Sequence, residues 1–124
     1  MSEKVYDLEE RTYLFAKRTR VFVKEIEKNI WNKEDIKQLV RATGSVAANY
    51  IEANEKLGDK DFLMKIRISK KECKESILWF RLLDLTDEKN EIVRTKLITE
   101  ATELKNILGA IYKNALNKNV TNSK

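Results

Sequence analysis

An apolar stripe with helical spacing runs unbroken from residue 62 to residue 83, and it constrains the fold more than any other feature. Its members recur at alternating steps of four and three residues: Phe62, Ile66, Ser69, Cys73, Ser76, Phe80 and Leu83. That spacing places them on one face of an α-helix that lasts three heptads. The chain contains no proline and only three glycines, so little in it would break a long helix.

Three further stretches show the same periodicity, and short turn signals separate them, among them Gly58 and Thr86-Asp87. We predict helices at about residues 8–28, 33–57, 60–85 and 88–116, with a frayed tail at 117–124. Asn32 is expected to cap the second helix. Connections of a few residues force consecutive helices to lie antiparallel. The predicted fold is therefore all-α, a single up-down-up-down antiparallel four-helix bundle that spans residues 1–124.

The bulk composition indicates a cytoplasmic protein. A chain of 124 residues suits one domain with its own core. Its single cysteine, Cys73, cannot form an internal disulfide, which is typical of a reducing compartment. The N-terminus lacks an apolar signal core, and no run approaches the roughly 20 apolar residues of a membrane span. We expect no membrane association.

Two polar residues stand among small and apolar ones in the stretch 44–62, namely Asn49 and Glu52. One interpretation is a structural polar latch, in which Glu52 pairs with an arginine of a neighbouring helix. The other is that Glu52 and Glu55 act as acid and base or hold a metal. Di-iron bundles use a Glu-x-x-His arrangement, and this chain has no histidine, so we favour the latch. The candidate partners are Arg11, Arg41 and Arg81.

The residues needed for the common catalytic constellations are missing. Without histidine, a Ser-His-Asp triad cannot form, and no glycine-rich phosphate loop is present. A reactive cysteine needs an exposed, electropositive setting, whereas Cys73 falls within the core stripe, so we expect it to be buried. We therefore predict a protein that is not an enzyme and that uses no metal and no cofactor.

The net charge of +5 is concentrated in the third predicted helix and in the tail from Gly109. Residues 60–81 carry seven basic and three acidic groups, and the tail carries three basic groups and no acidic one. The tail lysines, Lys113, Lys118 and Lys124, are expected to assist the third helix in binding an anionic partner. The basic residues that should face outward are Lys60, Arg67, Lys70, Lys71, Lys74 and Arg81. Such a face, about 30 Å long, could follow a phosphate backbone. No aromatic residue interrupts it, so base stacking is not indicated. The alternative is a solvated face that only keeps the protein in solution.

The same helix carries more apolar residues than one bundle core can bury. Those on one flank, outside the core stripe, are Met64, Ile68, Trp79 and Leu82. Exposed apolar patches usually mark interfaces. We interpret this flank as a candidate surface for homo-oligomerisation.

Three stretches of the chain resemble the bacterial four-helix-bundle family named for the 23S rRNA intervening sequence. They are YDLEERTYLFAKRTRVFVKEI, GSVAANYIEANEKLGDKDFLMKIRISKKECKES and WFRLLDL. The resemblance implies a small helical protein that assembles as a pentamer. A related protein accompanies the reverse transcriptase of diversity-generating retroelements and is a basic, barrel-shaped, nucleic-acid-binding pentamer. The family has no established catalytic residues, so none is carried over.

Two functions follow from these observations. The first is a non-enzymatic homo-oligomer that binds RNA or DNA electrostatically through the basic face of the third helix. The alternative is a protein-interaction or scaffold module that engages a partner protein and binds no nucleic acid.

Overall fold

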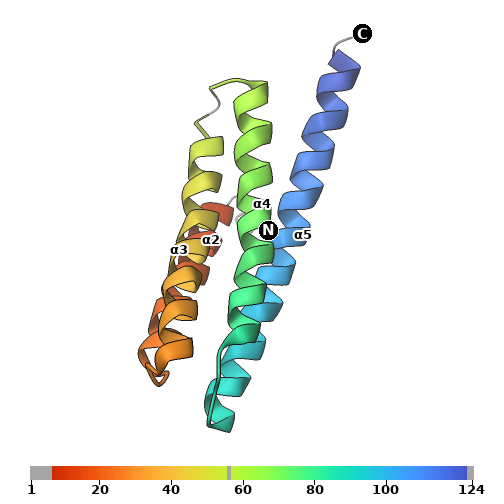
Figure 1. The fold of residues 1–124 in the computed structure, drawn as a ribbon. Helices are drawn as coiled ribbons and strands as arrows, with labels where there is room; N and C mark the ends of the chain where they lie inside the picture. The colour runs from red at the N-terminus through yellow and green to blue at the C-terminus, as the bar shows by residue number, and fades with distance from the viewer. Residues whose placement is uncertain (1–6, 56, 123–124) are drawn as a thin grey trace.

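Four α-helices make up most of the protein, which is described here by a computed structural model covering residues 7–55 and 57–122. Their direction alternates along the chain, so that each helix runs antiparallel to the one before it (Figure 1). In chain order the helices are α2 (Leu8–Lys24), α3 (Ile30–Ala53), α4 (Asp59–Leu82) and α5 (Glu88–Asn122).

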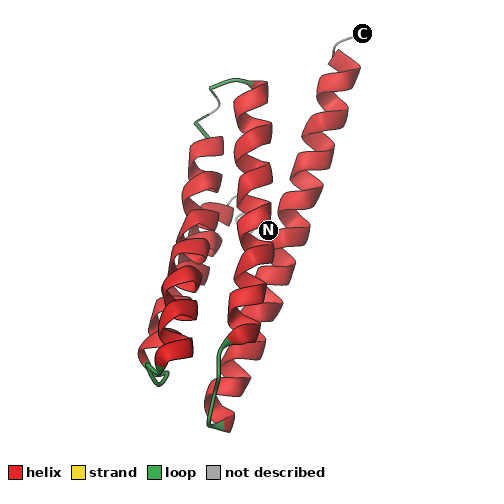
Figure 2. Ribbon diagram, viewed as in Figure 1, coloured by secondary structure: helices red, strands yellow, loops and turns green. Residues whose placement is uncertain are grey.

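The helices form a square in cross-section. Contacts link α2 with α3, α3 with α4, α4 with α5 and α5 with α2, whereas neither diagonal pair is in extensive contact. Short loops connect the helices, and the described residues contain no strand (Figure 2). The predicted all-α, up-down-up-down four-helix bundle is thus confirmed.

The first interhelical connection lies earlier in the chain than the sequence indicated. Helix α2 ends at Lys24, before the predicted residue 28, and the Lys28 ammonium donates to the carbonyls of Val23 and Ile26 at 2.7 and 2.9 Å. A cation there satisfies carbonyls that the helix end leaves free. Helix α3 then begins at Ile30 because Asn29, rather than Asn32, accepts a capping bond from the Asn32 amide at 2.8 Å.

The later helix boundaries follow local chemistry. Gly58 precedes α4 with φ of 144°, a backbone conformation that a side chain would strain. Asp87 caps α5 by accepting from the Asn90 amide at 2.7 Å. Helix α5 continues to Asn122, so the frayed tail expected from residue 117 is wrong for residues 117–122. Because no glycine or proline follows Gly109, each added residue can extend the helical hydrogen-bond ladder.

The core is organised around the predicted stripe of α4. Its members Ile66, Ser69, Cys73, Ser76 and Phe80 are fully buried. The Phe80 ring packs against two rings of α2, with centroids 6.3 Å from Phe15 and 6.2 Å from Phe22. Tilted aromatic pairs of this kind are favourable beyond the area that they bury.

A small residue, Ser69, lets α4 approach α3 closely. Its hydroxyl donates to the Val46 carbonyl of α3 at 2.7 Å, which requires near contact between the two helices. Gly44 of α3 faces α2, where an added Cβ would lie 3.2 Å from the guanidinium of Arg20.

The predicted latch of Asn49 and Glu52 is not buried. The Glu52 side chain is 55% exposed and accepts from Lys65 of α4 at 2.7 Å, so its partner is none of the arginines considered. The Asn49 amide donates within α3, to the carbonyl and hydroxyl of Ser45. Both residues lie beside, rather than on, the buried α3 stripe of Leu39, Val46 and Ala53.

Asn32 is a buried polar residue that joins two interhelical connections. It is fully buried, and its amide donates to the carbonyls of Glu27 at 3.0 Å and Asp84 at 2.8 Å. Its side-chain oxygen accepts from the Asp84 backbone amide at 2.8 Å. Asn32 therefore ties the α2–α3 connection and the α4–α5 connection to the start of α3.

We predict that Asn32→Ala lowers the free energy of unfolding by about 2–4 kcal/mol, because more than one buried backbone group loses its partner. Glu52→Ala serves as the control. An exposed ion pair contributes about 0–1 kcal/mol, so this second variant should stay close to the wild type. Urea denaturation at one fixed protein concentration measures both, and a smaller loss for Asn32→Ala than for Glu52→Ala would contradict the assignment.

Candidate nucleic-acid interface

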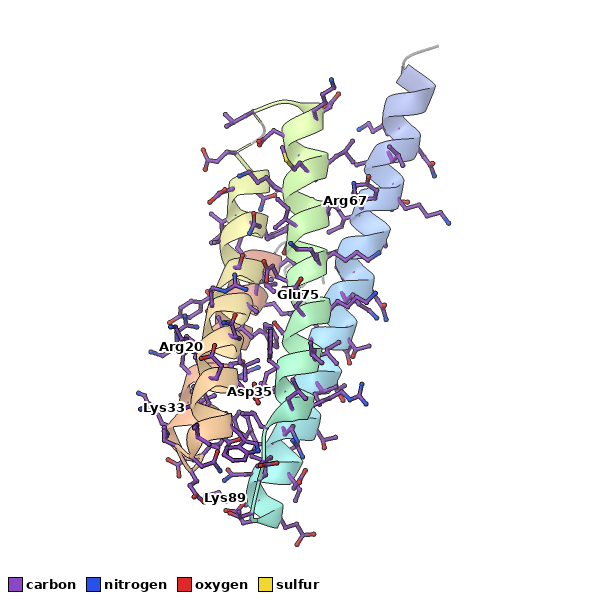
Figure 3. The ribbon with its side chains drawn as sticks, in the orientation of Figure 1. Arg20, Lys33, Asp35, Arg67, Glu75 and Lys89 are labelled. Carbon is purple, nitrogen blue, oxygen red and sulfur yellow. The ribbon has the colours of Figure 1, made fainter. Side chains whose placement is uncertain are left out.

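The six predicted basic residues lie on the outer face of α4, and we call this set the basic face. All six are exposed: Lys60, Arg67, Lys70, Lys71, Lys74 and Arg81. Among the described residues, none of them forms an ion pair, including the Lys71–Glu75 pair that a spacing of four residues would permit. Figure 3 labels Arg67 and Glu75 on this helix. The basic face therefore presents charge that the fold itself leaves unpaired.

The core stripe of α4 determines where the basic face points. The buried stripe fixes one side of the helix inward, and α3 and α5 pack on the two flanks. Residues seven apart drift by only about 20° around a straight helix. Lys60, Arg67, Lys74 and Arg81 therefore stay on one side over 21 residues, or about 30 Å.

Helix α5 extends this positive surface. The Lys70 side chain lies against Gly109 of α5, where an added Cβ would be 3.5 Å from Cε and 3.6 Å from Nζ. These are ordinary van der Waals distances, so the lysine stem packs against α5 at this position. Lys113, four residues after Gly109 and on the same side of α5, is exposed. Lys118 is also exposed, but it lies nine residues after Gly109 and therefore on the opposite side of the helix. Lys124, expected to assist from the tail, is outside the described residues.

Several other cations serve the fold instead. Arg11 of α2 donates to Glu100 at 2.7 and 2.8 Å and to Glu103 at 2.7 Å, and the hydrogen bond to Glu100 is the main cause that raises its pKa. Arg94 donates to the Phe80 and Leu83 carbonyls at the end of α4, at 3.2 and 2.7 Å. These residues join helices and are unsuited to binding a ligand.

Of the four residues of the candidate oligomer interface, Ile68 and Trp79 lie on the side of α4 towards α3, and Met64 and Leu82 lie farther out, next to the basic face. Met64 and Leu82 are 54% and 48% exposed, whereas Ile68 and Trp79 are half-buried. The Trp79 indole nitrogen is buried and has no hydrogen-bond partner among the described residues. This flank combines exposed apolar surface with an unsatisfied donor.

Glu72 is a residue that our sequence reasoning missed. It is 6% exposed, its Oε2 lies 4.0 Å from Arg41, and its Oε1 has no partner among the described residues. A signal was available, because Glu72 falls four residues after Ile68 and seven before Trp79. It therefore continues their flank with a carboxylate.

Among residues 7–55 and 57–122, no cluster of three or more histidine, cysteine, aspartate or glutamate side chains is arranged to hold a metal ion. No helix in that part of the chain is long and apolar enough to cross a membrane. Cys73 is buried, as predicted.

Comparison with known proteins places the chain in a family. The model of the family described as 23S rRNA-intervening sequence protein matches residues 5–110. The chain belongs to this family. All six residues of the basic face lie within the matched region, as does the flank that contains Met64 and Leu82.

A solved family relative supports the same fold. It is a crystal structure of a protein with unknown function from the S23 ribosomal protein family of Bacteroides thetaiotaomicron. The two chains share 25% sequence identity and superpose with a TM-score of 0.70, over 85% of this chain and 97% of the other. The search of curated proteins found no match to the chain described in this article.

We predict that the Cys73 thiol of the folded protein resists alkylation by iodoacetamide at pH 8 and reacts once urea unfolds the chain. Burial raises the pKa of this thiol from 9.0 to about 12, and the thiolate is the reactive form. Mass spectrometry of timed samples measures the reaction. Equal rates in the folded and unfolded protein would contradict a buried thiol.

The raised pKa of Cys73 also makes the free energy of unfolding depend on pH. Below pH 9 the thiol is protonated in both states, so its contribution is constant. Between pH 9 and about 12 the unfolded chain loses this proton first, which favours unfolding. Stability should therefore fall more steeply with pH over this interval in the wild type than in Cys73→Ala.

Proposed function

We propose that this protein is a non-enzymatic homo-oligomer that binds RNA or DNA through phosphate contacts made by the basic face of α4. The observation that carries the proposal is a row of six exposed cations that form no ion pair among the described residues. A surface of this kind attracts polyanions and releases their counterions on binding.

The chemistry of the basic face favours recognition of the backbone rather than of bases. No aromatic side chain belongs to the face, so unstacked bases would find no platform. Duplex DNA carries one charge per about 1.7 Å of its axis, and a face about 30 Å long can contact several phosphates. Binding should therefore depend strongly on salt and weakly on sequence.

Self-association would strengthen such contacts. The exposed Met64 and Leu82 support an interface between copies, and the family resemblance supplies a pentamer as the assembly. Each copy would add one basic face, so that weak contacts combine through avidity. The free thiol of Cys73 supports a reducing, cytoplasmic setting.

The alternative function is a scaffold that binds a protein partner and no nucleic acid. The apolar flank of α4 favours it, because exposed Met64 and Leu82 could contact another protein as well as a second copy. Nucleic-acid binding distinguishes the two functions.

We predict that mixed-sequence RNA and duplex DNA both bind at about 50 mM salt, and that affinity falls with salt by about one logarithmic unit per phosphate neutralised for each tenfold increase in salt. Changing Arg67, Lys70, Lys71 and Lys74 to Glu should abolish binding at that salt concentration. These side chains are exposed, so the helicity and the oligomer mass should stay unchanged. Fluorescence anisotropy across a salt series measures the affinity.

A matched variant controls for overall charge. Lys17, Lys24, Lys33 and Lys37 are also exposed lysines, and changing them to Glu alters the net charge by the same amount away from the basic face. This control should retain most of the affinity. If wild-type protein binds neither nucleic acid, the scaffold function is favoured, and if both variants lose affinity equally, the basic face is not the site.

A further inference from the structure

We infer that copies of this chain associate head to tail, with one flank of α4 from each copy seated in an open groove between α2 and α5 of the next. The inference rests on the proposed homo-oligomer and adds the two surfaces that form the contact. Lys71, seven residues after Met64, lies beside this flank, and the other residues of the basic face stay outside the contact.

The groove opens because α2 and α5 share the least extensive contact of the four neighbouring helix pairs. Its volume is about 520 Å³, and Val21, Val93 and Leu97 contribute an apolar lining. Val21 is 56% exposed and Leu97 is 5% exposed, and Val93 is half-buried, so the uncovered apolar surface of the groove is mainly that of Val21. The size is within the range of sites that bind ligands or side chains.

The groove is bordered mainly by positive charge. Arg18, Lys89 and Lys96 line it and are exposed, and none of the three forms an ion pair among the described residues. Glu25 also borders it. Figure 3 labels Lys89 near the start of α5. The groove therefore suits a partner that is apolar and carries carboxylates.

The flank of α4 that faces α3 has this composition, and we call it the ridge. Steps of four and three residues connect its members, which are Met64, Ile68, Glu72, Glu75, Trp79 and Leu82. The two glutamates lie between the apolar members. Glu72 is buried with Oε1 unpartnered in the described structure, and its Arg41 contact, at 4.0 Å, is too long for a hydrogen bond. Oε1 has no accessible surface in the single chain, so a cation from a second copy would reach it only after this side chain turned outward.

The ridge and the groove lie on opposite sides of the molecule. The ridge borders the α3–α4 side of the square and the groove opens on the α2–α5 side. The groove and the Trp79–Leu82 end of the ridge lie at a similar height, because Phe22, which lines the groove, packs against Phe80, the neighbour of Trp79. One copy therefore cannot fill its own groove. A contact between different surfaces repeats head to tail, and it forms a ring where the rotation closes.

Two variants that each disable one surface test this arrangement. Met64→Asp with Leu82→Asp disables the ridge, and Val21→Asp with Lys96→Asp disables the groove; all four positions are exposed. Sedimentation equilibrium of each variant alone should give the 14.6 kDa protomer, whereas an equimolar mixture should give heterodimers, because one intact ridge meets one intact groove.

Ile51→Asp, at an exposed position outside both surfaces, is the control and should keep the wild-type mass. Circular dichroism verifies that each variant folds.

The other outcomes overturn the inference in distinguishable ways. If the groove variant keeps the wild-type mass while the ridge variant dissociates, the ridge contacts a different surface. If both variants keep the wild-type mass, the interface lies elsewhere and only this inference fails. If the mixture of dissociated variants forms no dimer, the two surfaces do not bind each other. A monomeric wild type would overturn the proposed homo-oligomer as well.

Discussion

The contact of Phe80 with Phe15 and Phe22 fixes the arrangement on which the rest of the structure depends. These rings span the diagonal between α4 and α2, with centroids 6.2–6.3 Å apart, and all three are buried. Rotating α4 about its axis would withdraw Phe80 and expose the fully buried Ile66 and Cys73. The cost of exposing such apolar area is about 25 cal/mol per Å². The rotation of α4, and so the direction of each of its faces, is set by the core.

With its rotation fixed, α4 presents three different surfaces from one sequence of 24 residues. The inward stripe packs the bundle, the outer side carries the basic face, and the flank towards α3 carries the ridge. A helix surrounded on all sides would bury its flanks within its own domain. Because α4 contacts only α3 and α5 extensively, it keeps enough surface for the proposed nucleic-acid contact and the proposed self-association on neighbouring sides.

Periodicity made the helices, their order and the buried stripe of α4 predictable, because spacing along a helix determines which residues share a face. It could not assign individual polar partners. Glu52 was expected to be buried, yet it lies beside the α3 core stripe and pairs with Lys65 at the surface. Asn32 was expected only to cap a helix, and Glu72 was overlooked. Their roles depend on which loop or helix lies opposite, and that is a property of the tertiary structure. The groove between α2 and α5 arises from weak packing between distant segments, which no local pattern records.

Lysine footprinting by acetylation and mass spectrometry, with and without RNA, tests most directly whether α4 carries a nucleic-acid surface. RNA should slow the modification of Lys60, Lys70, Lys71 and Lys74, which the fold leaves unpaired, and should leave Lys33 and Lys37 of α3 unchanged. Protection of Lys33 and Lys37, with no change at Lys70, Lys71 and Lys74 under conditions in which RNA is bound, would contradict the account.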